Sequence, residues 1–115
     1  MNIMGILKDN GHGITRNSLD FWRANKDKIG PVLSVEVRDD LYVEQSPEGY
    51  PLEYPCAIYG TDGIIFLSGC TCGYGGEGPS GTAKVLEDIG VLPEDAGKLK
   101  LQKVVSYHAL DRRIA

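Results

Sequence analysis

Residues 56–89 read CAIYGTDGIIFLSGCTCGYGGEGPSGTAKVLEDI, and this stretch decides the fold that the sequence predicts. Two short apolar runs, residues 56–59 and 64–67, are joined by Gly-Thr-Asp-Gly, which predicts a β-hairpin. A glycine-dense loop follows. Apolar side chains then recur at helical spacing over residues 79–89, and Gly90 is a stop signal. A hairpin, a loop and a helix in this order are typical of an α+β domain.

Upstream of this stretch, the pattern predicts a short strand over residues 2–7, one helix, two further strands and a loop. Residues 18–29 carry a helical apolar face that stops at Gly-Pro. Residues 32–38 alternate apolar and polar side chains, which predicts a half-buried strand. We interpret Asp39-Asp40 as a turn and residues 41–45 as the return strand of a hairpin. The prolines and glycine of residues 46–55 predict a loop.

Downstream, the pattern predicts a late strand within residues 98–110 and a flexible tail over residues 111–115. A further helical turn is expected at residues 93–96. Together these elements predict a single α+β domain over residues 1–115. Its sheet is mainly antiparallel, and two principal helices pack on one face.

Composition narrows the classes of function. The chain has 115 residues, a net charge of −4 and a pI of about 5.1. An acidic protein of this size is not expected to coat a long nucleic acid, which calls for a basic surface. The N-terminal sequence lacks a signal-peptide pattern, and no apolar run reaches the ~20 residues of a membrane span. We therefore expect no membrane partner and a cytoplasmic location.

The glycine-dense loop is the candidate binding site. Six of the chain's 15 glycines lie between Gly69 and Gly81. Bare backbone amides can converge on an anion, and the helix that follows adds the positive end of its dipole. The expected partner is a small phosphorylated ligand such as a nucleotide, with Tyr74 stacking on a base. The expected ligand-binding residues are Gly73, Tyr74, Gly75, Gly76, Gly78, Ser80, Gly81, Arg38, Lys84, Arg112 and Arg113; Arg16 is a further cation able to pair with phosphate.

The loop matches neither common phosphate motif. No Gly-Lys-Ser/Thr follows it, as a Walker A loop requires, and G-x-G-x-x-G does not occur within a βαβ unit. Glu77 also places a negative charge beside the expected anion. A purely structural crossover is therefore the alternative interpretation of the loop.

Cysteine and histidine residues raise two further alternatives. Cys70 and Cys72 with Cys56 and a histidine, His12 or His108, form a weak zinc pattern, because structural zinc sites use two C-x₂₋₄-C pairs. A Cys–His enzyme would need a histidine beside a thiol. We favour reduced, packed thiols and expect no metal, no cofactor and no catalytic residue.

The segment Gly73-Tyr74-Gly75-Gly76-Glu77-Gly78-Pro79, followed by Ala83, resembles a G-Y-G-G-x-G-P-x-x-x-A signature of small proteins from phages, plasmids and other mobile elements. In those proteins an aromatic residue often precedes the first glycine, where this chain has Cys72. The core of the resemblance covers seven residues and implies a mobile-element context. By analogy with small phage proteins that sequester nucleotide signals of bacterial immunity, it implies a non-enzymatic binder.

A second class of function is a protein-binding module, for example an inhibitor of a host or toxin protein. Its contact surface would be acidic and would use Tyr50, Pro51, Tyr54 and Pro55, with the glycine loop purely structural. In either class we expect a homo-oligomer, because small sheets with exposed edges often pair.

Overall fold

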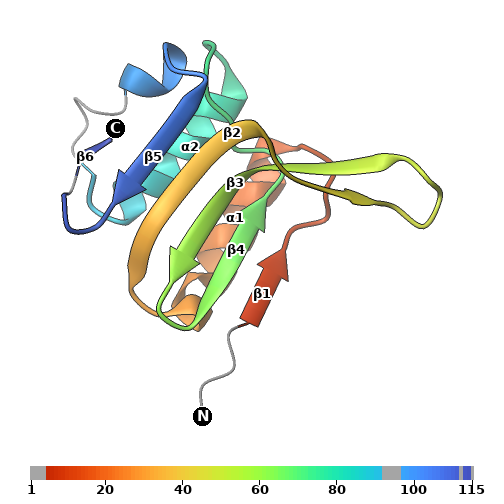
Figure 1. Ribbon diagram of the computed structural model, residues 1–115, viewed down its shortest axis with the longest axis horizontal. Helices are drawn as coiled ribbons and strands as arrows, with labels where there is room; N and C mark the ends of the chain where they lie inside the picture. The colour runs from red at the N-terminus through yellow and green to blue at the C-terminus, as the bar shows by residue number, and fades with distance from the viewer. Residues whose placement is uncertain (1–4, 92–96, 112, 115) are drawn as a thin grey trace.

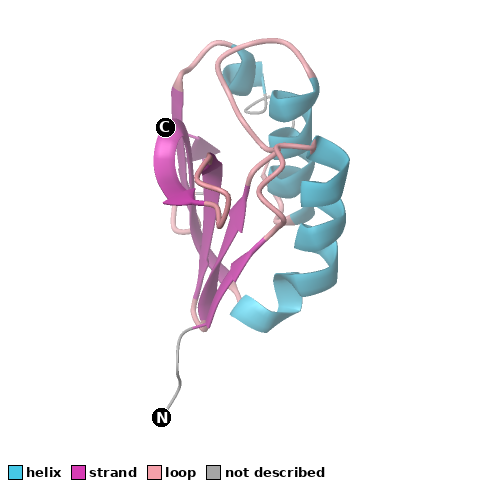
Figure 2. Ribbon diagram, turned by 90° about the vertical axis from the view of Figure 1, so that its right-hand side faces the viewer, coloured by secondary structure: helices cyan, strands magenta, loops and turns pink. Residues whose placement is uncertain are grey.

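The computed structural model describes residues 5–91, 97–111 and 113–114, with only the backbone of Arg113, and shows a sheet with both helices on one face (Figures 1 and 2). The strands are β1 (Gly5–Lys8), β2 (Val32–Gln45), β3 (Pro51–Gly60), β4 (Gly63–Leu67), β5 (Val104–His108) and β6 (Arg113–Ile114). Their order across the sheet is β1-β4-β3-β2-β5-β6. Only β1 and β4 pair in parallel among these strands. The predicted α+β class, with a mainly antiparallel sheet, is confirmed.

Two helices and two 3₁₀ turns complete the described chain: α1 (Thr15–Asn25), η1 (Lys26–Ile29), α2 (Glu77–Asp88) and η2 (Gly97–Lys100). The predicted second helix is confirmed, and Gly90 follows its end with a φ of 93°. The first helix begins at Thr15, three residues earlier than predicted, because the Ser18 hydroxyl bonds to Asp9 and does not cap the helix. No helix in the described part of the chain is long and apolar enough to cross a bilayer.

The core lies between the helices and the sheet. Trp22 from α1, Leu86 from α2 and Ile58 and Ile65 from the central strands are each at most 1% exposed. Burying a side chain of this size contributes about 1.5–3 kcal/mol. β2 alternates as predicted from Ser34 onward: Val35 and Val37 face the core, so the residues between and beside them face the open side of the sheet. Leu33, which the predicted alternation places on the same face as Val35, is 51% exposed, because the register with β3 shifts between Val32 and Ser34.

β2 does not turn at Asp39-Asp40, so the predicted hairpin at this point is wrong. The strand continues to Gln45, and its register with β3 shifts between Val37 and Tyr42. The extra residues form a bulge, which absorbs the two aspartates without ending the strand. The true turn lies at residues 46–50, where the Ser46 amide donates to the Tyr50 carbonyl over 2.8 Å.

The predicted loop over residues 46–55 is therefore also wrong beyond residue 50, because Pro51 begins β3. Residues 39–55 form a two-stranded hairpin that extends from the body of the sheet, seen in olive to yellow-green in Figure 1. We call these residues the arm. Proline lacks a ladder donor, but Pro51 lies at the first position of its strand and Pro55 lies at the bulge, where the ladder is already interrupted.

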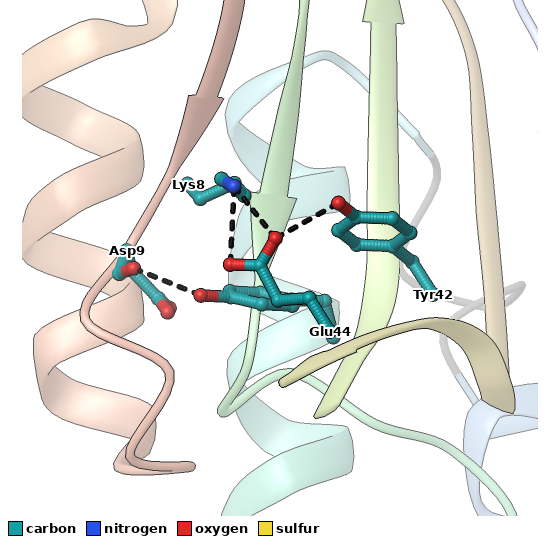
Figure 3. Close-up of polar contacts among 5 residues, drawn as sticks. Lys8, Asp9, Tyr42 and Glu44 are labelled. Atoms are coloured by element: carbon teal, nitrogen blue, oxygen red, sulfur yellow. Dashed lines mark hydrogen bonds and ion pairs between the residues drawn. The ribbon is translucent and has the colours of Figure 1, made fainter. Parts of the chain in front are cut away.

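The arm contacts β1 and β4 through Tyr42 and Glu44, and Glu44 is the residue before the last of β2. The Tyr42 ring stacks on Phe66 with centroids 4.7 Å apart. The Lys8 ammonium donates to Glu44 at 2.8 and 3.0 Å, and the Tyr42 hydroxyl donates to the same carboxylate at 2.9 Å (Figure 3). These hydrogen bonds, from Lys8 first and then Tyr42, hold the pKa of Glu44 below its ordinary value.

The C-terminal part departs from the predicted long strand and tail. Within residues 98–110 only Val104–His108 form a strand, and the turn expected at residues 93–96 lies outside the described residues. The backbone of Arg113–Ile114 pairs with β5, so these two residues are not a free tail. Ile114 is buried, and its carbonyl accepts a hydrogen bond from the Lys98 ammonium at 3.1 Å.

Candidate functional site

The two helices run parallel, so their N-termini lie at the same end of the molecule. At that end Gly81 of α2 lies against the Thr15 side chain of α1. At the other end Trp22 and Arg23 of α1 donate to the Asp88 carboxylate of α2 at 3.0 and 3.1 Å. Any side chain at position 81 would overlap Thr15, so the glycine sets the close approach of the helices.

A groove of about 410 Å³ runs between these helices on their outer side. We call it the interhelical groove. Its lining residues are Thr15, Arg16, Leu19, Asp20, Arg23, Glu77, Ser80, Gly81 and Lys84. Arg23 is already engaged by Asp88, whereas Arg16 and Lys84 are exposed. Asp20 and Glu77 add two negative charges, so the groove is mixed in charge, and these two carboxylates offset Arg16 and Lys84.

Both helices begin without a side-chain cap. The residues before them, Ile14 and Gly76, form no capping hydrogen bond, and α1 has no acidic residue in its first turn. Uncapped first-turn amides carry the positive end of the helix dipole, equivalent to about +0.5 charge per helix. Because the helices are parallel, their two positive ends lie at the same end of the interhelical groove, the end marked by Thr15 and Gly81.

Close packing accounts for much of the glycine density in the loop. A side chain on Gly69 would lie 2.5 Å from the carbonyl carbon of Ile14, and one on Gly78 would overlap Thr71. Gly81 is the helix contact described above. Gly73 has a φ of 95°, a conformation that favours glycine, and its amide donates to the Leu99 carbonyl over 2.6 Å. The structural interpretation therefore holds for these four glycines.

Gly75 and Gly76 are the loop glycines that border a second cavity. This hollow of about 440 Å³ lies on the other side of α2, and we call it the loop-side hollow. It is lined by Gly75, Gly76, Pro79, Ser80, Ala83, Gly97, Leu99 and Lys100. Ser80 therefore borders both cavities. Among the described residues, the backbone amides of positions 75–78 have no hydrogen-bond acceptor within the chain.

Tyr74 is folded back onto the loop. Its hydroxyl lies 2.9 Å from the Thr71 hydroxyl, and its ring covers Gly76. Tyr74 is nevertheless 51% exposed, so part of the side chain is accessible to a ligand. The aromatic ring is thus held in place before anything binds.

The structure brings together part of the predicted site. Ser80, Gly81 and Lys84 share the interhelical groove with Arg16. Arg38 lies on the open face of the sheet, away from the helices, and pairs with Glu36 at 2.5 Å. Arg112 lies outside the described residues, and Arg113 begins β6. Sequence reasoning missed Lys100 in the loop-side hollow, because nothing in its neighbourhood signals that η2 returns to the glycine loop.

The three cysteines are buried thiols. Burial raises the pKa of the Cys70 thiol to about 12 and raises the pKa values of Cys56 and Cys72 as well. The Cys72 sulfur donates to the Val37 carbonyl at 3.6 Å. Thiols held in this protonated state are poor nucleophiles and poor metal ligands. Among the described residues, no three His, Cys, Asp or Glu side chains lie together in a way that could hold a metal ion.

Comparison with known protein families, with curated proteins and with solved structures finds no significant match to this chain.

Proposed function

We propose that this protein binds a small phosphorylated ligand, of the nucleotide class, at the interhelical groove and does not transform it. The observation that carries the proposal is the convergence of Arg16, Ser80 and Lys84 beside two uncapped helix N-termini. These groups have well-understood affinity for phosphate: a guanidinium, an ammonium, a hydroxyl and first-turn amides.

Charge balance determines how strong such binding can be. Asp20 and Glu77 line the same groove and offset the two cations, so a singly charged anion gains little there. A phosphate group with two negative charges, or two linked phosphates, gains more because it can contact both cations and the amides at once. This balance favours a phosphorylated ligand over chloride or a carboxylate.

The nucleotide class follows from Tyr74. The Tyr74 ring packs over Gly76, the residue before α2, and is not among the residues that line the interhelical groove, so a base would stack on it by extending from the groove past the start of α2. Stacking of a base on an aromatic ring contributes about 1–3 kcal/mol. The resemblance to mobile-element proteins makes sequestration of a nucleotide signal the role that we assign to this binding. A sequestering protein needs affinity and abundance but no reactive group.

The test is calorimetry and thermal unfolding with inorganic phosphate, AMP, ATP and cyclic mono- and dinucleotides as probes. A bound probe at 100 times its Kd should stabilise the fold by about 2.7 kcal/mol. The double variant Arg16→Gln/Lys84→Gln should weaken binding at least about a hundredfold, since each of the two charge-assisted contacts contributes about 1.5–3 kcal/mol.

Arg38→Gln is the matched control, because it removes a cation from the opposite face of the sheet and should leave binding unchanged. Lys100→Gln shows which cavity binds the probe, because Lys100 lines the loop-side hollow and not the interhelical groove. If no probe stabilises the protein, or if Lys100→Gln abolishes binding while the double variant binds normally, the assignment to the interhelical groove is wrong.

A further inference from the structure

Charge is distributed unevenly between the arm and the rest of the chain. Residues 39–55 contain five of the 16 acidic residues and no lysine, arginine or histidine. All 12 lysines and arginines of the chain therefore lie outside the arm, against the remaining eleven acids. The negative net charge of the protein is thus carried by its one projecting element.

The arm also exposes apolar side chains and open strand edges. Val43 is 47% exposed and Tyr50 at its turn is 50% exposed. Pairing of β2 with β5 stops at Arg38, and pairing of β3 with β4 stops at Cys56. Both outer edges of the arm are therefore without a partner strand among the described residues. The β2 edge is open to another chain, whereas the β3 edge lies beside residues 9–11, where the Tyr54 hydroxyl donates to the Asp9 carbonyl at 3.3 Å.

A surface of opposite character lies where η2 leads into β5. Residues 97–104 contain three lysines and no acidic residue. Lys100 and Lys103 are exposed, and between and beside them Leu101 is 84% exposed and Val104 is 55% exposed. We call these four residues the basic patch. Lys103 lies against Gly73, so the basic patch is adjacent to the glycine loop.

We infer that the arm of one molecule docks on the basic patch of a second copy, in a head-to-tail arrangement. The two surfaces are complementary in charge and in their exposed apolar side chains. Glu48 and Glu53 of the arm oppose Lys100 and Lys103, while Val43 and Tyr50 match the exposed Leu101 and Val104. Within one molecule the arm extends away from β5, so the contact forms between molecules (Figure 1).

Charge disfavours a symmetric arm-to-arm contact. Two arms pairing edge to edge would bring ten carboxylates together without any cation from either arm, and like charges directly opposite on paired strands are destabilising. Acidic residues on an open edge are a known device against such self-pairing. The same acids attract the arm to a basic surface.

A head-to-tail contact uses two different surfaces of each copy, so it generates a closed ring or a growing chain of molecules. The assembly should weaken as salt rises, because exposed charges are screened over about 10 Å at 0.1 M ionic strength and about 3 Å at 1 M. Its mass should therefore fall toward the 12.5 kDa of the single chain.

Mixing of charge-reversed variants provides the test, read by light scattering after size exclusion. Glu48→Lys/Glu53→Lys reverses the arm, and Lys100→Glu/Lys103→Glu reverses the patch. Each variant alone should be a monomer under conditions where the natural chain associates. An equimolar mixture should associate again, because each reversed surface then meets an opposite charge on the other variant.

The control is Asp27→Lys/Glu87→Lys, which changes net charge as the arm variant does but at exposed sites on η1 and α2. It should associate like the natural chain. Circular dichroism establishes that every variant is folded. A natural chain that stays monomeric at 0.1 M salt, or a mixture that fails to associate, overturns the inference; so does association of the arm variant alone. None of these variants touches Arg16, Ser80 or Lys84, so ligand binding is scored separately.

Discussion

The indole nitrogen of Trp22 donates to the Asp88 carboxylate over 3.0 Å, and this bond joins the two helices at the end opposite to the Thr15–Gly81 contact. The Trp22 side chain is 1% exposed, so its N–H depends on this acceptor within the protein. Arg23 donates to the same carboxylate oxygen from the surface. The helix pair is thus fixed at both ends, and the interhelical groove between those ends has fixed walls.

We expect Asp88→Ala to lower the free energy of unfolding by about 1–3 kcal/mol, because it leaves the buried Trp22 donor unsatisfied. Asp88→Asn keeps an acceptor and should cost less. Glu87→Ala, at an exposed neighbouring position, should change stability by no more than about 0.5 kcal/mol. Urea unfolding followed by tryptophan fluorescence measures all three. Equal losses for Asp88→Ala and Glu87→Ala would show that the bond contributes nothing.

The same carboxylate predicts a pH dependence. Burial raises the pKa of Asp88, but the hydrogen bonds from Arg23 and Trp22 outweigh burial and hold the pKa below its ordinary value. A folded-state pKa below the unfolded value of about 3.9 gives stability that is present above that pH. It is lost as pH falls through the folded pKa. The stability difference between the natural chain and Asp88→Asn should therefore shrink between pH 5 and acid pH, and a difference that grows on acidification would contradict the assignment.

The contact between Gly81 and Thr15 predicts a rescue. Gly81→Ala places a methyl group against the Thr15 methyl and should cost about 1–3 kcal/mol through overpacking. Thr15→Ser removes that methyl and keeps the hydroxyl that donates to the Gly69 carbonyl at 2.7 Å. When Thr15→Ser is already present, Gly81→Ala should be neutral or stabilise by up to about 1 kcal/mol, since alanine favours helix. A double-mutant cycle by urea unfolding measures the coupling, and additive effects would refute it.

Buried thiols predict slow chemical modification. In the native protein at pH 8, none of the three cysteines should react quickly with Ellman's reagent, because burial keeps them protonated and covered. In unfolding concentrations of urea all three should react. Fast reaction of one thiol in the native protein would mean that its surroundings open.

The hydrogen bonds of Asp9 predict a large loss of stability when this residue is replaced. Its carboxylate is buried and accepts hydrogen bonds from the amides of Gly11 and Ser68, each over 2.9 Å, and from the Ser18 hydroxyl. Asp9→Asn replaces one acceptor with a donor that faces these donors, so we expect a loss of about 3 kcal/mol. Asn10→Ala is the control: its side chain accepts only the exposed His12 amide and should matter little. Thermal unfolding of both variants measures the two losses of stability, and similar losses would contradict the prediction.

Sequence pattern predicted the elements that rest on local rules. The hairpin of β3 and β4, the alternation at the start of β2 and the helix before Gly90 all follow from periodicity and turn residues. The arm was missed because Asp39-Asp40 and the prolines at 51 and 55 have strong local preferences against strands. Pairing along a bulged hairpin overrides those preferences, and pairing is a property of two segments at once.

The candidate site also combines residues that could be found from sequence with residues that depend on tertiary packing. The glycine loop and the helix after it could be found from sequence, and so could Ser80 and Lys84. The parallel pairing of α1 and α2, which brings Arg16 beside them, depends on tertiary packing at Gly81. Arg38 looked equivalent to the other cations in sequence, yet strand alternation turns it toward the opposite face of the sheet.

β2 runs from the middle of the sheet to the tip of the arm as one strand of fourteen residues. In the body it is paired on both sides, by β3 and by β5. A mechanical pull on the tip therefore passes along a continuous backbone into the strand that is hardest to detach. The arm is continuous with a central strand of the domain, so a partner that binds its tip is connected through one strand to the middle of the sheet.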